Sequence, residues 1–148
     1  MYCLVVDDDP LMVELASRVL RAAGHEVDGV LSAEAALASM RSRKPKLVLL
    51  DARMPGMDGF GMLKVVRAEP EWSEIPVIMV TGLRARADVL KAQEHGASGY
   101  VLKPFDQKQL LHRVSACLER RAAGLGSGGP GDSPPGATAD HPDNSWLL

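Results

Sequence analysis

Five short runs rich in β-branched residues and leucine recur along the chain, and segments of helical character separate them. The runs are YCLVV (2–6), EVDGV (26–30), KLVLL (46–50), PVIMV (76–80) and SGYVL (98–102). The third and fourth runs are almost entirely apolar, which is typical of strands that are covered on both faces. Repeated strand–helix alternation predicts a parallel sheet with helices on both sides. The segment lengths suit an α/β fold of the flavodoxin-like, doubly wound (βα)5 type, with strand order 2-1-3-4-5.

Capping residues predict where the helices begin. Asp9 is the expected N-cap of the first helix, with Pro10 at its first position and Leu11, Leu15 and Val19 on its apolar stripe. This helix should stop at Gly24. The other four helices are expected from Ser32, over about 59–68, over about 85–95, and after a capping box formed by Asp106 and Gln109.

The composition changes abruptly near residue 122. From there the chain is rich in Gly, Pro, Ser and Asp and has few residues that could build a core. We therefore expect one domain over residues 1–121 and a disordered tail or linker over residues 122–148. Only Trp146, Leu147 and Leu148, at the end of that tail, could dock on a surface.

Charge and cysteine usage exclude several functional classes. The 148 residues carry 17 basic and 19 acidic side chains, a formal net charge of −2, so direct binding to nucleic acid or to a membrane surface is not expected. No apolar run approaches the roughly 20 residues that a membrane helix needs. Cys3 and Cys117 lie in apolar settings far apart, which favours reduced thiols, and no secretory signal is visible. These features predict a cytoplasmic location.

Polar side chains follow four of the five predicted strands. Asp7 and Asp8 follow the first strand, Asp51 the third, Thr81 the fourth and Lys103 the fifth. The carboxyl ends of parallel strands share one edge of a sheet, and ligands bind there at the point where the strand order reverses. In the order 2-1-3-4-5 that point lies between the first and third strands, which carry the three acids.

This set of groups favours magnesium-dependent phosphoryl transfer. Three carboxylates held close together repel one another, so at least one should have a raised pKa when no cation is present. Their hard oxygen atoms suit Mg²⁺. A carboxylate such as Asp51 can act as the nucleophile and form an aspartyl phosphate, while Lys103 supplies positive charge and the Thr81 hydroxyl a hydrogen bond.

These motifs together resemble the receiver domain of bacterial two-component response regulators. The resemblance covers about residues 2–121. It rests on VVDDDP at the first strand, LVLLDARMPGMDGF around Asp51, VIMVTG at the fourth strand and GYVLKPF at the fifth. Any one of these motifs alone is weak, whereas the combination is highly specific.

The resemblance implies a role for each matching residue. Asp51 would be the phosphoacceptor, Asp8 a direct metal ligand and Asp7 a ligand through water. Arg53 would offer its backbone carbonyl to Mg²⁺. Lys103 would contact the phosphoryl group, and the Lys103–Pro104 peptide bond would be cis. Thr81 and Tyr100 would form a coupled switch pair.

The implied function is signalling, with a phosphoryl group taken from a sensor histidine kinase or a phosphotransfer protein. Such a domain is no enzyme beyond catalysing its own phosphorylation and dephosphorylation. Its output would be a downstream effector protein or domain that binds the face of helix 4, strand 5 and helix 5, here about residues 90–95, Tyr100 and residues 108–118. The sequence leaves open whether this is a stand-alone regulator or part of a larger regulator or hybrid kinase.

Other interpretations account for parts of the same pattern. DDDP can be only a helix start, MPGMDG only a turn-rich loop, Thr81 only a cap and Tyr100 only a core aromatic. A pseudo-receiver that acts as a constitutive protein-binding module is the alternative function. A phosphohydrolase with an aspartate nucleophile, of the haloacid-dehalogenase-like class, fits less well. Such enzymes have a second acid two residues after the nucleophile, where this chain has Arg53.

Overall fold

A computed structural model of the chain describes residues 1–122 and has the predicted architecture. Five parallel strands form one sheet in the order β2-β1-β3-β4-β5. The strands are β1 (Tyr2–Val6), β2 (Glu26–Val30), β3 (Leu47–Leu50), β4 (Val77–Thr81) and β5 (Gly99–Leu102). The helices are α1 (Pro10–Ala22), α2 (Ala33–Ser42), α3 (Gly59–Ala68), α4 (Arg86–Glu94) and α5 (Gln107–Ala122). The tail that we predict from residue 122 lies, from residue 123 on, outside the described residues.

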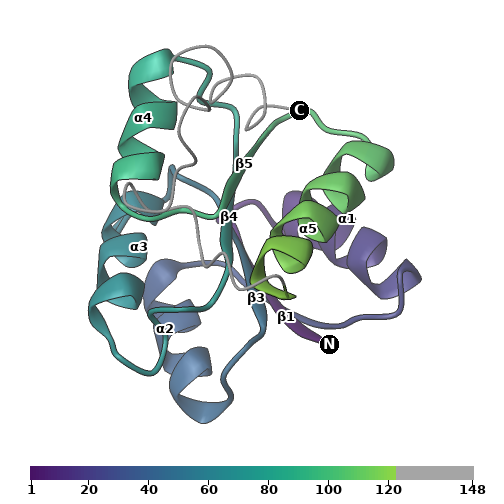
Figure 1. Cartoon of the computed structure of the whole chain (residues 1–148), viewed down its shortest axis with the longest axis horizontal. Coiled ribbons are helices and arrows are strands. Elements are labelled where there is room, and N and C mark those ends of the chain that lie inside the picture. The colour runs from purple at the N-terminus through teal and green to yellow at the C-terminus, as the bar shows by residue number, and fades with distance from the viewer. Residues whose placement is uncertain (123–148) are drawn as a thin grey trace.

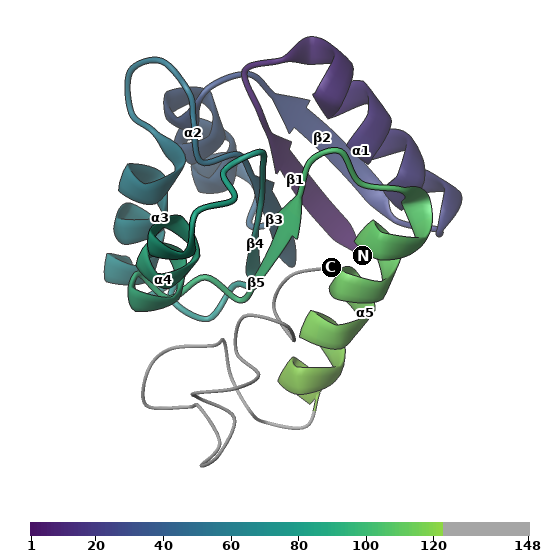
Figure 2. The ribbon, with the colours of Figure 1, turned by 90° about the horizontal axis from the view of Figure 1, so that it is seen from above.

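The helices cover both faces of the sheet, as Figures 1 and 2 show. Helices α1 and α5 lie on one face, over an apolar cluster that includes Leu20, Leu49 and Leu110. Helices α2, α3 and α4 lie on the other face, over a larger cluster that includes Met40 and Met62. Every residue of β1, β3 and β4 is buried, which confirms that near-continuous apolar runs mark strands covered on both sides.

The helix starts follow the predicted caps. The Asp9 carboxylate accepts a hydrogen bond from the backbone N–H of Leu11 at 3.0 Å, and the Ser32 hydroxyl accepts one from Ala35 at 3.0 Å. At α5 the capping box is complete: the Gln109 N–H donates to the Asp106 carboxylate at 2.7 Å, and the Asp106 N–H donates to the Gln109 side chain at 2.9 Å. A further N-cap, Asp58 on α3, was not predicted.

The predicted apolar stripe of α1 is wrong at Leu11 and Leu15, whereas Val19 does pack against the core. Leu11 and Leu15 are 64% and 43% exposed, whereas Ala16 and Leu20 are buried. The reason is close packing, because α1 approaches the sheet through its small side chains. At Gly29 on β2 an added Cβ would overlap the Val13 side chain, so the helix face that contains Val13, Ala16 and Leu20 is the one that fits.

Arg67 holds together the two loops that lead into β4 and β5. Its Nε donates to the Gly96 carbonyl at 2.8 Å, and its Nη1 donates to the Ile75 carbonyl at 2.8 Å and the Ser73 carbonyl at 3.1 Å. The loop after β5 contains the predicted cis peptide bond, Lys103–Pro104. The Arg67 bonds tie the segment before β4 to the segment before β5.

Within residues 1–122, none of the helices has the length and apolar character needed to cross a membrane.

Candidate functional site

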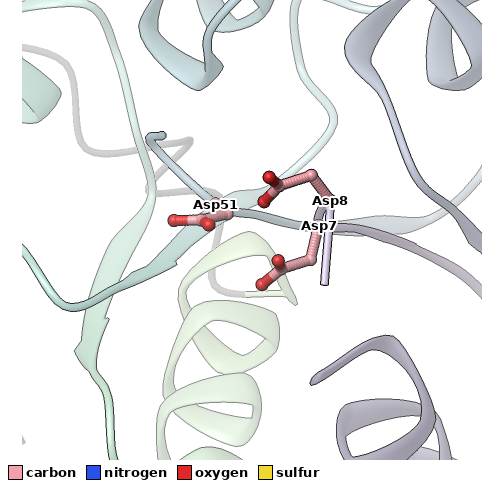
Figure 3. Close-up of side chains that lie close together, drawn as sticks. All are labelled: Asp7, Asp8 and Asp51. Carbon is pink, nitrogen blue, oxygen red and sulfur yellow. The ribbon is translucent and has the colours of Figure 1, made fainter. Parts of the chain in front are cut away.

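Three carboxylates converge where the strand order reverses. Val6 of β1 pairs with Leu50 of β3, so Asp7 and Asp51 emerge from neighbouring strands side by side. The backbone N–H of Asp51 donates to the Val6 carbonyl at 3.0 Å, which continues this pairing. Oxygen atoms of Asp7, Asp8 and Asp51 all lie within 4.8 Å of one another, and Figure 3 shows the three side chains gathered at this point. The predicted acidic cluster therefore forms.

The three acids differ in exposure. Asp7 is 3% exposed and Asp51 7% exposed, whereas Asp8 lies at the surface. Carboxylate oxygens are the ligands that Mg²⁺ and Ca²⁺ prefer, and magnesium commonly uses only one or two carboxylates together with water and phosphate oxygens. The donor set fits such a cation, with Asp8 on the open side of the cluster and the other two acids behind it.

Lys103 supplies the positive charge within the cluster. Its Nζ lies 2.6 Å from Oδ2 of Asp7 and 3.3 Å from Oδ2 of Asp51. Burial raises the pKa of Asp7, and the hydrogen bond from Lys103 offsets only part of that rise. Burial lowers the pKa of Lys103, but the hydrogen bond to Asp7 and the charge of Asp51 outweigh it, so the net pKa is raised. The ammonium group therefore stays charged at neutral pH.

Arg53 approaches the site through its backbone. Its N–H lies 3.3 Å from Oδ1 of Asp51 and donates to it. The loop that carries both residues is tied to α2, because the Glu34 carboxylate accepts a hydrogen bond from the Met57 N–H at 3.2 Å. Sequence reasoning missed Glu34, and no local signal marks it, because its partner lies 23 positions away.

Thr81 and Tyr100 meet at one residue of the loop between β4 and α4. The Thr81 hydroxyl accepts a hydrogen bond from the Leu83 N–H at 3.4 Å, and the Tyr100 hydroxyl donates to the Leu83 carbonyl at 2.8 Å. Tyr100 is fully buried, and Thr81 is 1% exposed. Burial raises the pKa of Tyr100, with further contributions from the negative charges of Asp88 and Asp51, so the hydroxyl remains a donor. Leu83 was not predicted, because its contribution is made by the backbone.

An open groove of about 480 Å³ runs beside the acidic cluster. Asp8, Arg53 and Asp58 line one part of it, and Leu83 and Lys91 line another. The groove is open to solvent and leads to the exposed side of the cluster. A phosphate-bearing group could approach the acids from this side.

Comparisons with known proteins agree with this geometry. The family model described as "Response regulator receiver domain" matches residues 3–115. The chain is 42% identical over 117 residues to the DNA-binding response regulator MtrA of Mycolicibacterium smegmatis, a match that covers 79% of this chain and 50% of that protein. It is 35% identical to the DNA-binding dual master transcriptional regulator RpaA of Synechocystis, over 79% of this chain and 48% of that protein. The chain thus spans about half the length of these relatives.

Solved structures show the same fold. A putative response regulator from Chloroflexus aurantiacus superposes with a TM-score of 0.77 at 35% identity, covering 80% of this chain and 98% of that one. The BeF3-activated DrrB receiver domain superposes with a TM-score of 0.73 at 34% identity, covering 80% of this chain and 97% of that one. The family match, the strand order and the acidic cluster lead to one conclusion: this chain belongs to the response regulator receiver domain family of two-component signalling.

Proposed function

We propose that this domain accepts a phosphoryl group on Asp51, in a Mg²⁺-dependent reaction, from a sensor histidine kinase or a phosphotransfer protein. One observation carries the proposal. The Asp51 carboxylate lies within reach of the Lys103 ammonium at 3.3 Å and belongs to an acidic cluster that fits a hard cation. A nucleophile, a fixed positive charge and a metal-binding group are the parts that phosphoryl transfer requires.

In the proposed reaction a carboxylate oxygen of Asp51 attacks the phosphorus atom of a phosphohistidine. The P–N bond to the imidazole breaks as the new P–O bond forms, and the product is an acyl phosphate on Asp51. Lys103 balances the charge on the phosphoryl oxygens. A bound Mg²⁺, held by Asp7, Asp8, Asp51 and the backbone carbonyl of Arg53, would supply further positive charge to those oxygens.

The phosphorylated state would be sensed through Thr81. We propose that its hydroxyl leaves the Leu83 N–H and donates to a phosphoryl oxygen instead. The loop between β4 and α4 would then rearrange, and with it the Leu83 carbonyl to which Tyr100 is bonded. This change would alter the face formed by α4, β5 and α5, where a downstream effector protein or domain would bind. The scheme is a two-state element biased by a local charge.

The output of the described domain is proposed to pass through protein contacts. The names of MtrA and RpaA describe DNA binding, but the near-balanced charge of this sequence, 17 basic against 19 acidic side chains, does not favour nucleic-acid binding. We therefore propose no direct contact of this domain with nucleic acid or membrane. Cys3 and Cys117 are both free and buried, which suits the reducing cytoplasm in which we place the protein.

Incubation with Mg²⁺ and acetyl phosphate, followed by intact-protein mass spectrometry, tests the proposal. The wild-type chain should gain one phosphoryl group, and Asp51→Asn should gain none. Asp106→Asn is the matched control, because it removes one carboxylate at the same edge of the sheet, outside the groove, and asparagine can still cap α5. This control variant should be modified like wild type.

Two results would contradict the proposal. Rapid release of many equivalents of phosphate would indicate a phosphohydrolase. No modification with acetyl phosphate, or with a phosphorylated histidine kinase as donor, would leave the pseudo-receiver as the better description.

A further inference from the structure

Gly59, the first residue of α3, lies directly against the peptide backbone that carries Asp51. A Cβ added at Gly59 would overlap the Asp51 carbonyl oxygen, and it would lie 2.8 Å from the Ala52 Cα and 2.9 Å from the Asp51 carbonyl carbon. The Gly59 N–H donates to the Ala52 carbonyl at 2.9 Å. These three nearest atoms all belong to the main chain, so rotation of a side chain cannot relieve the overlap.

Conformation does not explain this glycine. Among the described residues, the glycines with positive φ are Gly24, Gly56 and Gly96, and Gly59 is not one of them. Gly59 lies in a helix, where glycine is a poorer former than alanine. Its place in the motif MPGMDG is therefore not that of a turn residue. What the position requires is space next to Asp51.

The close contact with Gly59 limits where the backbone of Asp51 can lie. The Asp51 carboxylate lies 3.3 Å from both Lys103 Nζ and the backbone nitrogen of Arg53, and the proposed chemistry depends on these contacts. A shift of the Asp51 peptide by about 1 Å would change these distances, and misplacement of this size can cost about 10²-fold in rate.

We propose that Gly59 is a positioning residue for phosphoryl transfer. Because Gly59 has no side chain, α3 can pack directly against the Asp51 backbone and keep the Asp51 carboxylate in contact with Lys103. The inference rests on the proposed role of Asp51 as the phosphoacceptor. Gly59 itself touches neither the phosphoryl group nor the metal in this scheme, and it acts through the backbone of the acceptor.

Gly61, two residues further along α3, provides a matched comparison. A Cβ at Gly61 would lie 3.2 Å from Cγ of Met57 and 3.4 Å from Oδ1 of Asp58. Both atoms belong to side chains, and the methionine is flexible, so an added methyl group can be accommodated. The same glycine-to-alanine change in the same helix thus presses on Asp51 at one position and leaves it in place at the other.

The test compares Gly59→Ala, Gly61→Ala, Asp51→Asn and the wild-type chain. The rate constant of phosphorylation by acetyl phosphate is measured at saturating Mg²⁺ and expressed per folded molecule, with the folded fraction taken from circular dichroism. Gly59→Ala should be slower by at least about tenfold, from the cost of misplacement, and Gly61→Ala should match wild type. Amide NMR shifts of Asp51 and Ala52 should change in Gly59→Ala and stay unchanged in Gly61→Ala.

A folded Gly59→Ala chain with the wild-type rate and wild-type Asp51 shifts would overturn the inference. If Gly59→Ala is only partly folded, trimethylamine N-oxide favours its compact state, and the same comparison applies there. A merely structural role would lower the folded fraction and leave the rate per folded molecule intact. If the wild-type chain itself is not modified, the proposed function fails, while the Asp51 shifts still decide whether Gly59 positions that residue.

Discussion

Replacing Lys103 with methionine removes a cation that contacts two of the clustered acids and keeps the length of the side chain. Lys103 Nζ lies 2.6 Å from Asp7 and 3.3 Å from Asp51, and 19% of its side chain is exposed. With an effective dielectric constant of about 20, Coulomb's law gives roughly 6 and 5 kcal/mol for these two distances before any desolvation cost. Most of that attraction is offset by the removal of the three groups from water.

The net loss of stability in Lys103→Met should be near the lower end of the range for broken buried ion pairs. Removal of one partner of such a pair costs about 3–5 kcal/mol, because it leaves an uncompensated buried charge. Partial solvent access to Lys103 favours the lower value, so we expect the free energy of unfolding to fall by about 3 kcal/mol in metal-free buffer at pH 7. The domain should remain folded, because this loss is smaller than the total free energy of unfolding of a typical domain, about 5–15 kcal/mol.

The deficit should shrink as the pH falls. Burial already raises the pKa of Asp7 above 3.8, and the hydrogen bond from Lys103 lowers it, so loss of that bond raises it further. In the variant, the native state then takes up a proton on Asp7 before the unfolded chain does. Stability linked to Asp7 is therefore fully present below pH 3.8 and is lost as the pH rises through the raised pKa.

Urea unfolding followed by circular dichroism, with EDTA present, measures the effect between pH 7 and pH 4.5. Lys64→Met is the matched control, because Lys64 lies on the exposed side of α3, and it should change stability little. The double variant Asp7→Asn with Lys103→Met should recover a large part of the loss. The reasoning is refuted if Lys103→Met is as stable as wild type at pH 7, or if its deficit grows as the pH falls.

Three further predictions concern the acids that follow β1 and the Arg67 anchor. Asp9→Ala should lower the free energy of unfolding by about 1 kcal/mol through loss of the α1 cap, measured by urea unfolding, and should leave phosphorylation intact. Asp8→Ala should abolish Mg²⁺ binding in isothermal titration calorimetry, and it should raise metal-free thermal stability because one repelling charge is gone. Arg67→Met leaves partly buried carbonyl groups without their donor and should cost about 2 kcal/mol or more in urea unfolding, with Arg67→Lys restoring only part of it.

Each of these has a result that contradicts it. Loss of Mg²⁺ binding in Asp9→Ala but not in Asp8→Ala would mean that the metal-binding acids are misassigned by one residue. Wild-type stability of Arg67→Met would mean that water replaces the guanidinium at the Ile75 and Gly96 carbonyls.

Much of the site was predictable because its side chains directly follow strands. Asp7, Asp51 and Lys103 come one residue after β1, β3 and β5, and a parallel sheet brings such positions to one edge regardless of details elsewhere. Helix starts were predictable for a similar reason, since a cap such as Asp9 or Ser32 acts on a residue two or three positions away. Local signals of this kind need no knowledge of the tertiary structure.

Features that depend on distant partners were not predictable. The orientation of α1 follows from the close approach of Gly29 to Val13, and the apolar periodicity of α1 alone favoured the face with Leu11 and Leu15. The bonds of Arg67 reach backbone carbonyls in two other loops, and nothing near Arg67 in the sequence marks them. Gly59 was correctly predicted at the start of a helix, but its reason was not predictable, because glycine serves both turns and close packing and only the fold distinguishes the two.

The direction of α5 determines how far the end of this helix lies from Asp51, the proposed phosphoacceptor. The helix starts four residues after Lys103, beside the site, and extends for 16 residues, about 24 Å, toward the opposite edge of the sheet (Figure 2). A fluorophore attached at the last turn of α5 would therefore lie far enough from Asp51 to leave access for the donor unobstructed. The same geometry means that a label meant to sense phosphorylation belongs on α4 or on the loop before it, not at the end of α5.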